Sequence, residues 1–260
     1  AVGTGLNAFE ILNNPPAATL LVNLEPEVDA VDGEQTIARL RNADCVVVLS
    51  SYVTDIMRDY ADVILPISTP AETAGTWVNA EGRWQSVNGV VKPFGQARPA
   101  WKVMRVMGNL LDLGGFDYLS NDEIRREIQG FCADVELDNT QIQLSALDPI
   151  DAPVASNDLA LIVAPAMYGS DPIVRRAVHL QATELAKKQR CILVHPEDAQ
   201  RIGVANGAEV QIQAGSKTLS LPVYIDELIN PGSVLIYRSP LTTSINMALS
   251  SVTVTAKVAA

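Results

Sequence analysis

The stretch 60–85 constrains the fold more than any other part of the chain. It opens with an aliphatic run, Val63-Ile64-Leu65, and the next residue, Pro66, lacks the amide proton that a strand interior donates. Two glycines and Asn79 follow, and these residue types favour turns. We therefore expect a short strand that ends at Pro66, followed by a shaped loop and turn and not by a helix.

The residues before this stretch alternate between apolar runs and helical patterns. Apolar runs at 19–24, 44–49 and 63–65 predict three buried strands, and the residues between them carry the spacing of short helices, one of them capped by Thr54. This order is typical of a parallel sheet that is covered on both faces. Ligands of such sheets bind beyond the carboxyl ends of the strands, although an ordinary parallel sheet with polar loops explains the same pattern.

The segment after the stretch predicts further local elements. Asn88-Gly89 indicates the turn of a hairpin between Val87 and Val91. A helix is expected over 100–113, and a capping box at 120–123 indicates a second one. Residues 134–157 are acidic and polar and contain two prolines, which is typical of a connection between domains.

The last hundred residues predict a β-rich second domain. Asp171 followed by Pro172 indicates the start of a helix that runs to Lys187-Lys188. Gly203 is expected to stop a short helix that begins at Pro196. Strands are expected at 159–163, 192–194, 210–213, 219–223, 234–236 and 252–258. The predicted class is α/β, with a parallel-sheet Rossmann-like domain at 1–133, an acidic linker at 134–157 and a β-rich domain at 158–260.

Two segments resemble a known family. Residues 61–66, with Glu72, Gly75, Thr76, Asn79, Glu81, Gly82, Arg83 and Gln85, resemble the pattern ADVVLP…E…GT…N.EGR.Q of the molybdopterin oxidoreductase superfamily. This superfamily includes formate dehydrogenases, nitrate reductases and the large iron–sulfur subunit of bacterial NADH–quinone oxidoreductase (complex I). Residues 192–212 and 231–234 resemble its molybdopterin-dinucleotide-binding domain, which implies a six-stranded β-barrel of the double-psi type. The resemblance implies the C-terminal portion of a superfamily member.

The resemblance marks six candidate cofactor-binding residues. They are the motif positions Glu72, Gly75, Thr76, Asn79, Glu81 and Arg83. A structural role explains the same residues and is the favoured interpretation, because Asn and Gly shape turns and Glu81 or Arg83 can pair across a loop. No catalytic residue is assigned. No metal ligand is assigned either, because His179 and His195 lack partners at ligand spacing.

The resemblance also implies that the cofactor site has decayed. In catalytic relatives a segment rich in His and Thr and bearing Arg holds the pterin, and the matching residues 164–171 contain none of the three. Ser239 stands where relatives have the Asn of Asn-x-Leu-Thr. The ligand of the metal in these relatives lies in an earlier domain. We therefore expect no molybdopterin in this chain.

Composition excludes several function classes. The net charge of −11 argues against a nucleic-acid partner, whose phosphates need Lys and Arg. No apolar run reaches 18 residues, so no direct membrane insertion is expected, and the start has no features of a signal peptide. The three cysteines show no CxxC spacing and are expected to be buried. Three such thiols do not suffice for an iron–sulfur cluster held by this chain alone. The family resemblance implies that the clusters lie in N-terminal domains outside this sequence.

Together these observations favour the complex I branch of the superfamily. The resemblance then implies a non-catalytic scaffold in the electron-transferring peripheral arm. Its expected partners are other peripheral-arm subunits, at the cytoplasmic face of the membrane. The first alternative is the C-terminal part of a formate-dehydrogenase-like enzyme that binds molybdopterin guanine dinucleotide. The second is a separate binding protein that uses the same fold.

Overall fold

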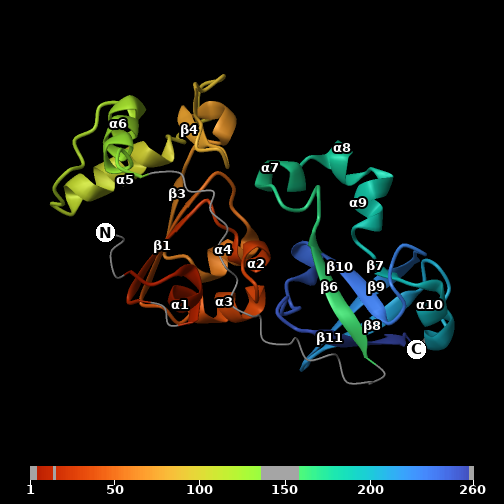
Figure 1. The fold of residues 1–260 in the computed structure, drawn as a ribbon. Coiled ribbons are helices and arrows are strands. Elements are labelled where there is room, and N and C mark those ends of the chain that lie inside the picture. Colours follow the sequence, from red (N-terminus) through yellow and green to blue (C-terminus); the bar gives the residue numbers. More distant parts are fainter. Residues whose placement is uncertain (1–4, 14–15, 136–157, 258–260) are drawn as a thin grey trace. The chain divides into compact units, whose positions relative to one another are not determined.

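The computed structural model describes residues 5–13, 16–135 and 158–257 (Figure 1). Its contacts form two compact units. The sheet unit contains β1 (Ala18–Val22), β2 (Cys45–Ser50), α4 (Asp55–Tyr60), β3 (Val63–Pro66), the 3-10 turn η1 (Pro70–Glu72), β4 (Gly75–Val78), β5 (Trp84–Val87), α5 (Ala100–Leu110) and α6 (Asn121–Phe131). The barrel unit contains α1 (Ala8–Asn13), α2 (Pro26–Asp29), α3 (Gly33–Leu40) and every element from residue 159 onward.

The sheet unit is built on a three-stranded parallel sheet in the order β1-β2-β3, as predicted. Val46, Val48 and Leu49 of the central strand are fully buried. The predicted burial is wrong for both outer strands. Burial alternates along β1 and leaves Leu20 exposed, and no residue of β3 is buried. The helix after β2 begins where expected, since the Thr54 side chain accepts a hydrogen bond from the Met57 amide at 3.0 Å.

The predicted hairpin at Asn88-Gly89 is wrong. The hairpin lies earlier, where β4 and β5 pair antiparallel around a turn at 79–83. Gly89 instead passes close to the backbone of η1, where an added Cβ would lie 3.1 Å from the Glu72 carbonyl oxygen. The Val90 amide next to it donates to Ala71 O at 2.8 Å. The glycine at 89 therefore permits a close backbone approach and does not form the turn.

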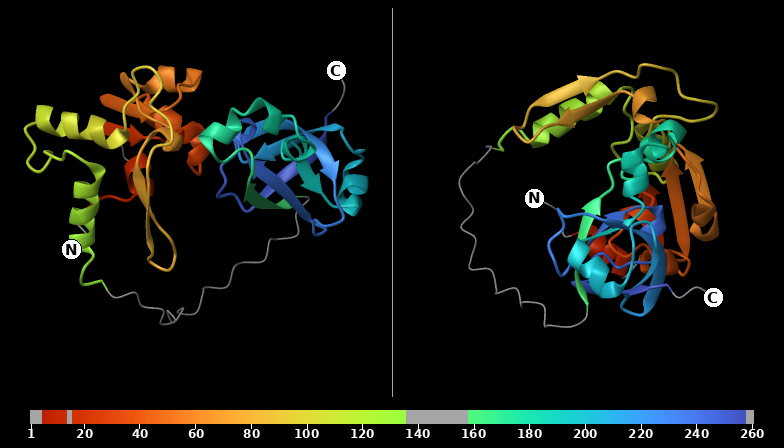
Figure 2. Two further views of the ribbon diagram at one scale, coloured as in Figure 1. Left: turned by 90° about the horizontal axis from the view of Figure 1, so that it is seen from above. Right: turned by 90° about the vertical axis from the view of Figure 1, so that its right-hand side faces the viewer.

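Two helices complete the sheet unit, close to the predicted positions. α5 ends at Leu110, three residues earlier than expected. α6 begins after the capping residue Ser120, whose hydroxyl accepts from the Glu123 amide at 3.3 Å. Figure 2 shows α6 beside the hairpin, where Arg125 Nη1 donates to Ser86 Oγ at 2.6 Å. Most of the predicted linker lies outside the described residues, and the proposed domain boundaries stay a prediction.

The barrel unit is built on a closed barrel of six strands in the order β10-β6-β11-β8-β9-β7. The strands are β6 (Leu159–Pro165), β7 (Ile192–Val194), β8 (Glu209–Ala214), β9 (Lys217–Ile225), β10 (Ser233–Arg238) and β11 (Ser251–Ala256). Two pairings, β6 with β10 and β7 with β9, are parallel, so the connections cross the barrel. The expected double-psi barrel is therefore confirmed. Ile192, Ile212 and Ile236 are fully buried in its core.

The helix predicted from Pro172 to Lys188 is wrong in extent. Three short helices replace it: α7 (Pro172–Arg175), α8 (Val178–Gln181) and α9 (Glu184–Lys188). Ala177 and Thr183 are extended, and the Thr183 hydroxyl accepts from the Ala186 amide as a new N-cap. The start at Asp171 is confirmed, and so is α10 (Pro196–Ile202), which ends at Gly203 with a φ of 80°. The last short element is the 3-10 turn η2 (Pro240–Thr242).

Candidate functional site

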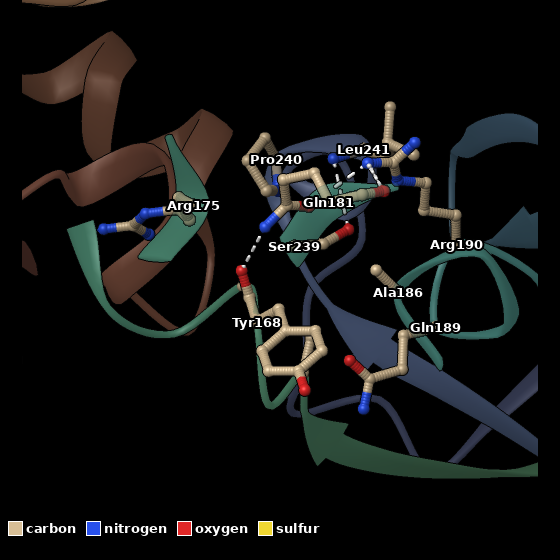
Figure 3. Close-up of a pocket in the computed structure, with 11 residues that line it drawn as sticks. Tyr168, Arg175, Gln181, Ala186, Gln189, Arg190, Ser239, Pro240 and Leu241 are labelled. Atoms are coloured by element: carbon tan, nitrogen blue, oxygen red, sulfur yellow. Dashed lines mark hydrogen bonds between the residues drawn. The ribbon is translucent and has the colours of Figure 1, made fainter. Parts of the chain in front are cut away.

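The two segments that the sequence marks as a degenerate pterin site lie together at one end of the barrel. β6 pairs in parallel with β10, so the residues that follow these strands emerge at the same edge. Tyr168 and Gly169 from the first segment and Ser239 to Leu241 from the second line one cavity of about 290 Å³ (Figure 3). The structure therefore places the two segments in the wall of the same cavity.

The remaining wall of the cavity comes from Ala166, from Arg175 of α7, and from α8, α9 and the two residues that follow α9. Gln181 Nε2 donates to Tyr168 O at 2.7 Å and to Val174 O at 3.0 Å. Arg190 Nη2 donates to the backbone oxygen and to Oε1 of Gln181, both at 3.1 Å. These hydrogen bonds link the residues of the wall to one another. They occupy part of the donors of Gln181 and Arg190.

The segment 239–242 is stabilised by its own hydrogen bonds. Ser239 Oγ accepts from the Leu241 amide at 3.3 Å, and Thr242 Oγ1 accepts from the Ser239 amide at 2.9 Å. The two side chains form a capping box around η2. Both hydroxyl oxygens thus accept hydrogen bonds from backbone amides within the turn.

Two consecutive arginines follow the first segment, and the sequence analysis missed them as site residues. Arg175 Nη2 lies 3.4 Å from Glu25 Oε2, and Arg175 Nη1 lies 3.7 Å from Asp29 Oδ1. Arg176 Nη2 lies 2.9 Å from the other oxygen of Glu25. Figure 3 shows the Arg175 guanidinium turned away from Gln181 and Arg190. The segment that the resemblance assigns to pterin binding ends at residue 171. Both arginines follow it by about one helical turn and were therefore not predicted.

One acceptor at the cavity has no partner within the described residues. Gln189 is 8 % exposed, and its Oε1 makes no hydrogen bond there. Ala166, Ala186, Pro240 and Leu241 contribute apolar surface to the wall of the same cavity. The arrangement suits a small group that donates one hydrogen bond and otherwise makes apolar contacts.

The six motif residues lie in the sheet unit, where local contacts account for several of them. Asn79 Oδ1 accepts from the amides of Glu81 at 3.1 Å and Arg83 at 2.8 Å, and so shapes the hairpin turn. Gly75 and Thr76 are strand residues of β4, and Thr76 Oγ1 lies 3.1 Å from Ser86 Oγ. Cofactor binding by these residues stays a prediction.

Glu72 shapes the loop after the sheet. Its Oε2 accepts from the Thr69 amide at 2.9 Å, and its Oε1 accepts from the Phe94 amide at 3.0 Å. The Thr69 bond stabilises the carboxylate and lowers its pKa from the ordinary value, with a smaller contribution from Phe94. The side chain therefore joins two parts of the loop through backbone amides.

Other reactive residues are dispersed. Within residues 5–13, 16–135 and 158–257, no group of three His, Cys, Asp or Glu side chains has the geometry of a metal site. His195 caps α10 through Nδ1, which accepts from the Glu197 amide at 3.2 Å. The expected burial of the cysteines is wrong for Cys132, which is exposed at the end of α6, and Cys45 and Cys191 are half-buried.

Comparison with known proteins agrees with the architecture. Residues 3–109 match the molybdopterin oxidoreductase family, and residues 176–259 match the molydopterin dinucleotide binding domain. Two successive parts of the chain are thus similar to domains of molybdopterin oxidoreductases. Acetylene hydratase from Pelobacter acetylenicus shares the fold, with a TM-score of 0.58 and 16 % identity over 85 % of this chain and 36 % of that one.

Several oxidoreductase relatives are similar in sequence. The NADPH-Fe(3+) oxidoreductase subunit alpha of Geobacter sulfurreducens is 25 % identical over 83 % of this chain, which spans only 26 % of that relative. The mitochondrial NADH-ubiquinone oxidoreductase 78 kDa subunit of Candida albicans is 41 % identical over 69 residues, or 26 % of this chain and 10 % of the relative. A putative formate dehydrogenase of Staphylococcus aureus is 38 % identical over 93 residues, or 35 % of this chain and 9 % of the relative.

The family implies a molybdopterin dinucleotide, and the cavity is a poor match for this anionic group. Phosphates bind where guanidinium donors are available. Here the charges of Arg175 and Arg176 are balanced by Glu25 and Asp29, and Arg190 is engaged with Gln181.

No helix of the described part is both long and apolar enough to cross a membrane.

Proposed function

We propose that this chain is the C-terminal part of the large iron–sulfur subunit of a respiratory NADH–quinone oxidoreductase (complex I), and acts there as a scaffold without catalysis of its own. The observation that carries the proposal is the ion pairing of Arg175 and Arg176 with Glu25. Internal carboxylates neutralise the arginines beside the cavity, which supports a loss of the molybdopterin from this branch. The similarity to the 78 kDa subunit supports the same assignment.

A scaffold role also requires contact surface, and the sheet unit offers it. Among residues 69–135 only Gly108 is buried. Trp77, Phe94, Leu119 and Phe131 are each more than half exposed. Exposed apolar residues in such number mark surfaces that associate with other protein. We propose that other peripheral-arm subunits, or the cluster-bearing domains of the same polypeptide, cover them at the cytoplasmic face of the membrane.

The alternative is a catalytic molybdopterin oxidoreductase of the formate dehydrogenase type. The similarity to the putative formate dehydrogenase supports it. In that case, the cavity at the barrel end would hold part of a molybdopterin guanine dinucleotide, and Glu25 would have to release the arginines when the cofactor binds.

The metal content of the whole protein separates the two. The full-length protein is purified from its own host, and iron, molybdenum and pterin are measured. Iron without molybdenum or pterin is the result expected for the complex I subunit. Molybdenum together with pterin would overturn that assignment and support the enzyme. Absence of all three would leave a binding protein that uses this fold.

A further inference from the structure

The segment 82–111 differs in charge from the rest of the chain. It contains five basic residues and no Asp or Glu, whereas the whole chain carries a net charge of −11. The five are Arg83, Lys92, Arg98, Lys102 and Arg105. None of them forms an ion pair within the described residues, although the exposed lysines Lys187 and Lys257 of the barrel unit do. The positive charge of this segment is therefore not compensated by carboxylates of the described chain.

Strongly exposed apolar side chains lie among these cations. Val90 is 85 % exposed, Val91 58 % and Phe94 86 %. The exposed side chains of Lys92, Arg98 and Lys102 accompany them. We call these six residues the 90–102 surface. Apolar side chains flanked by uncompensated cations fit a partner surface that is apolar at its centre and acidic at its rim.

The backbone of this loop is fixed even though its side chains are exposed. The Val90 amide donates to Ala71 O at 2.8 Å, and the Phe94 amide donates to Glu72 Oε1 at 3.0 Å. Further along, Arg98 O accepts from the Ser68 amide at 2.9 Å. A loop that is held at three points loses little conformational entropy when a partner binds. The 90–102 surface is thus preorganised for contact.

The hairpin of β4 and β5 leaves a second apolar face open. Thr76 and Ser86 lie on the face that meets α6, where Arg125 Nη1 donates to Ser86 Oγ at 2.6 Å. Trp77 and Val87 point to the opposite face, because successive residues of a strand alternate in direction. Their exposed fractions are 61 % and 45 %. This open face adjoins the end of β5, from which the chain continues into the 90–102 surface.

The small core of the sheet unit indicates what kind of partner covers these residues. Among residues 69–135 only Gly108 is buried, and no residue of β3 is buried. A unit that leaves so much apolar surface open resembles one half of a divided core, which is the character of permanent interfaces. The chain spans 26 % of the length of its Geobacter sulfurreducens relative. Under the proposed function, most of the polypeptide therefore lies outside this sequence and can supply a permanent cover.

We propose that a part of the same polypeptide outside this sequence covers the 90–102 surface and the open face of the hairpin. The covering part presents apolar side chains around Phe94, and Asp and Glu side chains opposite Lys92, Arg98 and Lys102. The inference rests on the proposed function in one respect, which is that the chain belongs to a longer polypeptide. The mass of the protein isolated from its own host tests that respect separately.

Hydroxyl-radical oxidation followed by peptide mass spectrometry tests the cover without any substitution. This chain and the full-length polypeptide are compared, each purified without other proteins. Phe94 should be oxidised at least about fivefold more slowly in the full-length protein, since a side chain that is 86 % exposed becomes buried. Leu228 of the barrel unit, which is 89 % exposed, should react at the same rate in both. Equal oxidation of Phe94 in both proteins, or equal protection of Phe94 and Leu228, would overturn the proposal.

The same measurement identifies any other occupant. Protection of Phe94 that appears only when other subunits are present would assign the surface to a separate protein. Protection of this chain by vesicles of phosphatidylglycerol would assign it to an anionic membrane, and protection that grows with the concentration of this chain would assign it to a second copy. Each of these results contradicts a cover from the same polypeptide.

Charge reversal tests the acidic character of the cover. Lys92→Glu with Arg98→Glu in the full-length protein should speed the oxidation of Phe94 at least about threefold, because carboxylates then face carboxylates. Lys187→Glu with Lys257→Glu changes the net charge equally on exposed positions of the barrel unit and should leave Phe94 protected. Equal oxidation of Phe94 in the two double variants would show that the cover does not recognise the cations of the 90–102 surface.

Discussion

The guanidinium of Arg175 lies 3.4 Å from the carboxylate of Glu25, and both side chains are almost completely buried. The pair joins α2 to α7, two short helices that are far apart in the sequence but belong to the same compact unit. The ion pair thus links the two segments, and it neutralises the positive charge of Arg175 beside the cavity.

Loss of Arg175 should strongly destabilise the barrel unit. Arg175→Met leaves Asp29 and part of Glu25 without a compensating charge, and we expect the free energy of unfolding to fall by about 3 kcal/mol. Urea unfolding measures it. Lys217→Met, which breaks the exposed pair with Glu34, should cost less than about 1 kcal/mol. An equal fall of the free energy of unfolding in the two variants would show that burial does not increase the contribution of the Arg175 pair.

The hairpin turn should depend on Asn79 and not on Arg83. Asn79→Ala removes the acceptor of two backbone amides, so a loss of about 1–2 kcal/mol is expected in thermal or urea unfolding. Arg83→Ala removes an exposed side chain and should change stability by no more than about 0.5 kcal/mol. A larger effect of Arg83→Ala than of Asn79→Ala would show that the Arg83 side chain, and not Asn79, stabilises the turn.

The pair of Lys188 and Asp226 should make stability depend on pH at both extremes. Lys188 Nζ donates to Asp226 Oδ2 at 2.6 Å and thereby lowers the pKa of Asp226 from 3.8 and raises the pKa of Lys188 from 10.5. The contribution of Asp226 is present above pH 3.8 and is lost as pH falls through its lowered pKa. The contribution of Lys188 is present below pH 10.5 and is lost as pH rises through its raised pKa.

Urea unfolding of wild type and Lys188→Met across this range checks the sign. Near neutral pH the variant should be less stable by about 1–2 kcal/mol, because Asp226 loses a charge-assisted bond. The difference should shrink toward strongly acidic and strongly alkaline pH. A difference that stays constant down to the lowest pH at which the protein folds would contradict the assigned bond.

Gly33 should not tolerate a side chain. A Cβ at this position would lie 2.4 Å from the Glu27 carbonyl oxygen, which belongs to the backbone and cannot move aside cheaply. Gly33→Ala is expected to lower the free energy of unfolding by about 1–3 kcal/mol. Gly114→Ala is the control, since its Cβ would meet no atom within 4 Å. Similar melting temperatures for both variants would show that α2 and α3 separate easily.

The thiols of Cys132 and Cys191 should react with an alkylating reagent at different rates. Cys132 is exposed, whereas burial raises the pKa of the half-buried Cys191 thiol and lowers its thiolate fraction. Timed alkylation with iodoacetamide, followed by peptide mass spectrometry, should therefore label Cys132 first and Cys191 at least about tenfold more slowly. In Cys132→Ser the rapid phase should vanish. Rapid labelling of Cys191 would show that the region around β7 opens in solution.

Local signals in the sequence predicted many element boundaries correctly. Thr54, Ser120 and Asp171 each cap the helix that follows, and Gly203 ends the helix before it. Each of these contacts spans only two to four residues, so the amino acids near a boundary contain the information needed. The alternation of strands and helices likewise predicted the parallel sheet, and the family motifs predicted the barrel.

The misplaced elements depend on residues that are distant in sequence. Asn88-Gly89 has the composition of a turn, but its place is set by contact with Ala71 and Glu72. The cavity exists because β6 pairs with β10, and its charge is balanced because Arg175 meets Glu25. Short-range preferences are worth about 1 kcal/mol or less per residue, whereas burying or unpairing a charge costs several times more. The sequence by itself therefore determined most of the elements and the similarity to the family. Tertiary packing decided where the hairpin lies and that carboxylates neutralise the charge of the arginines.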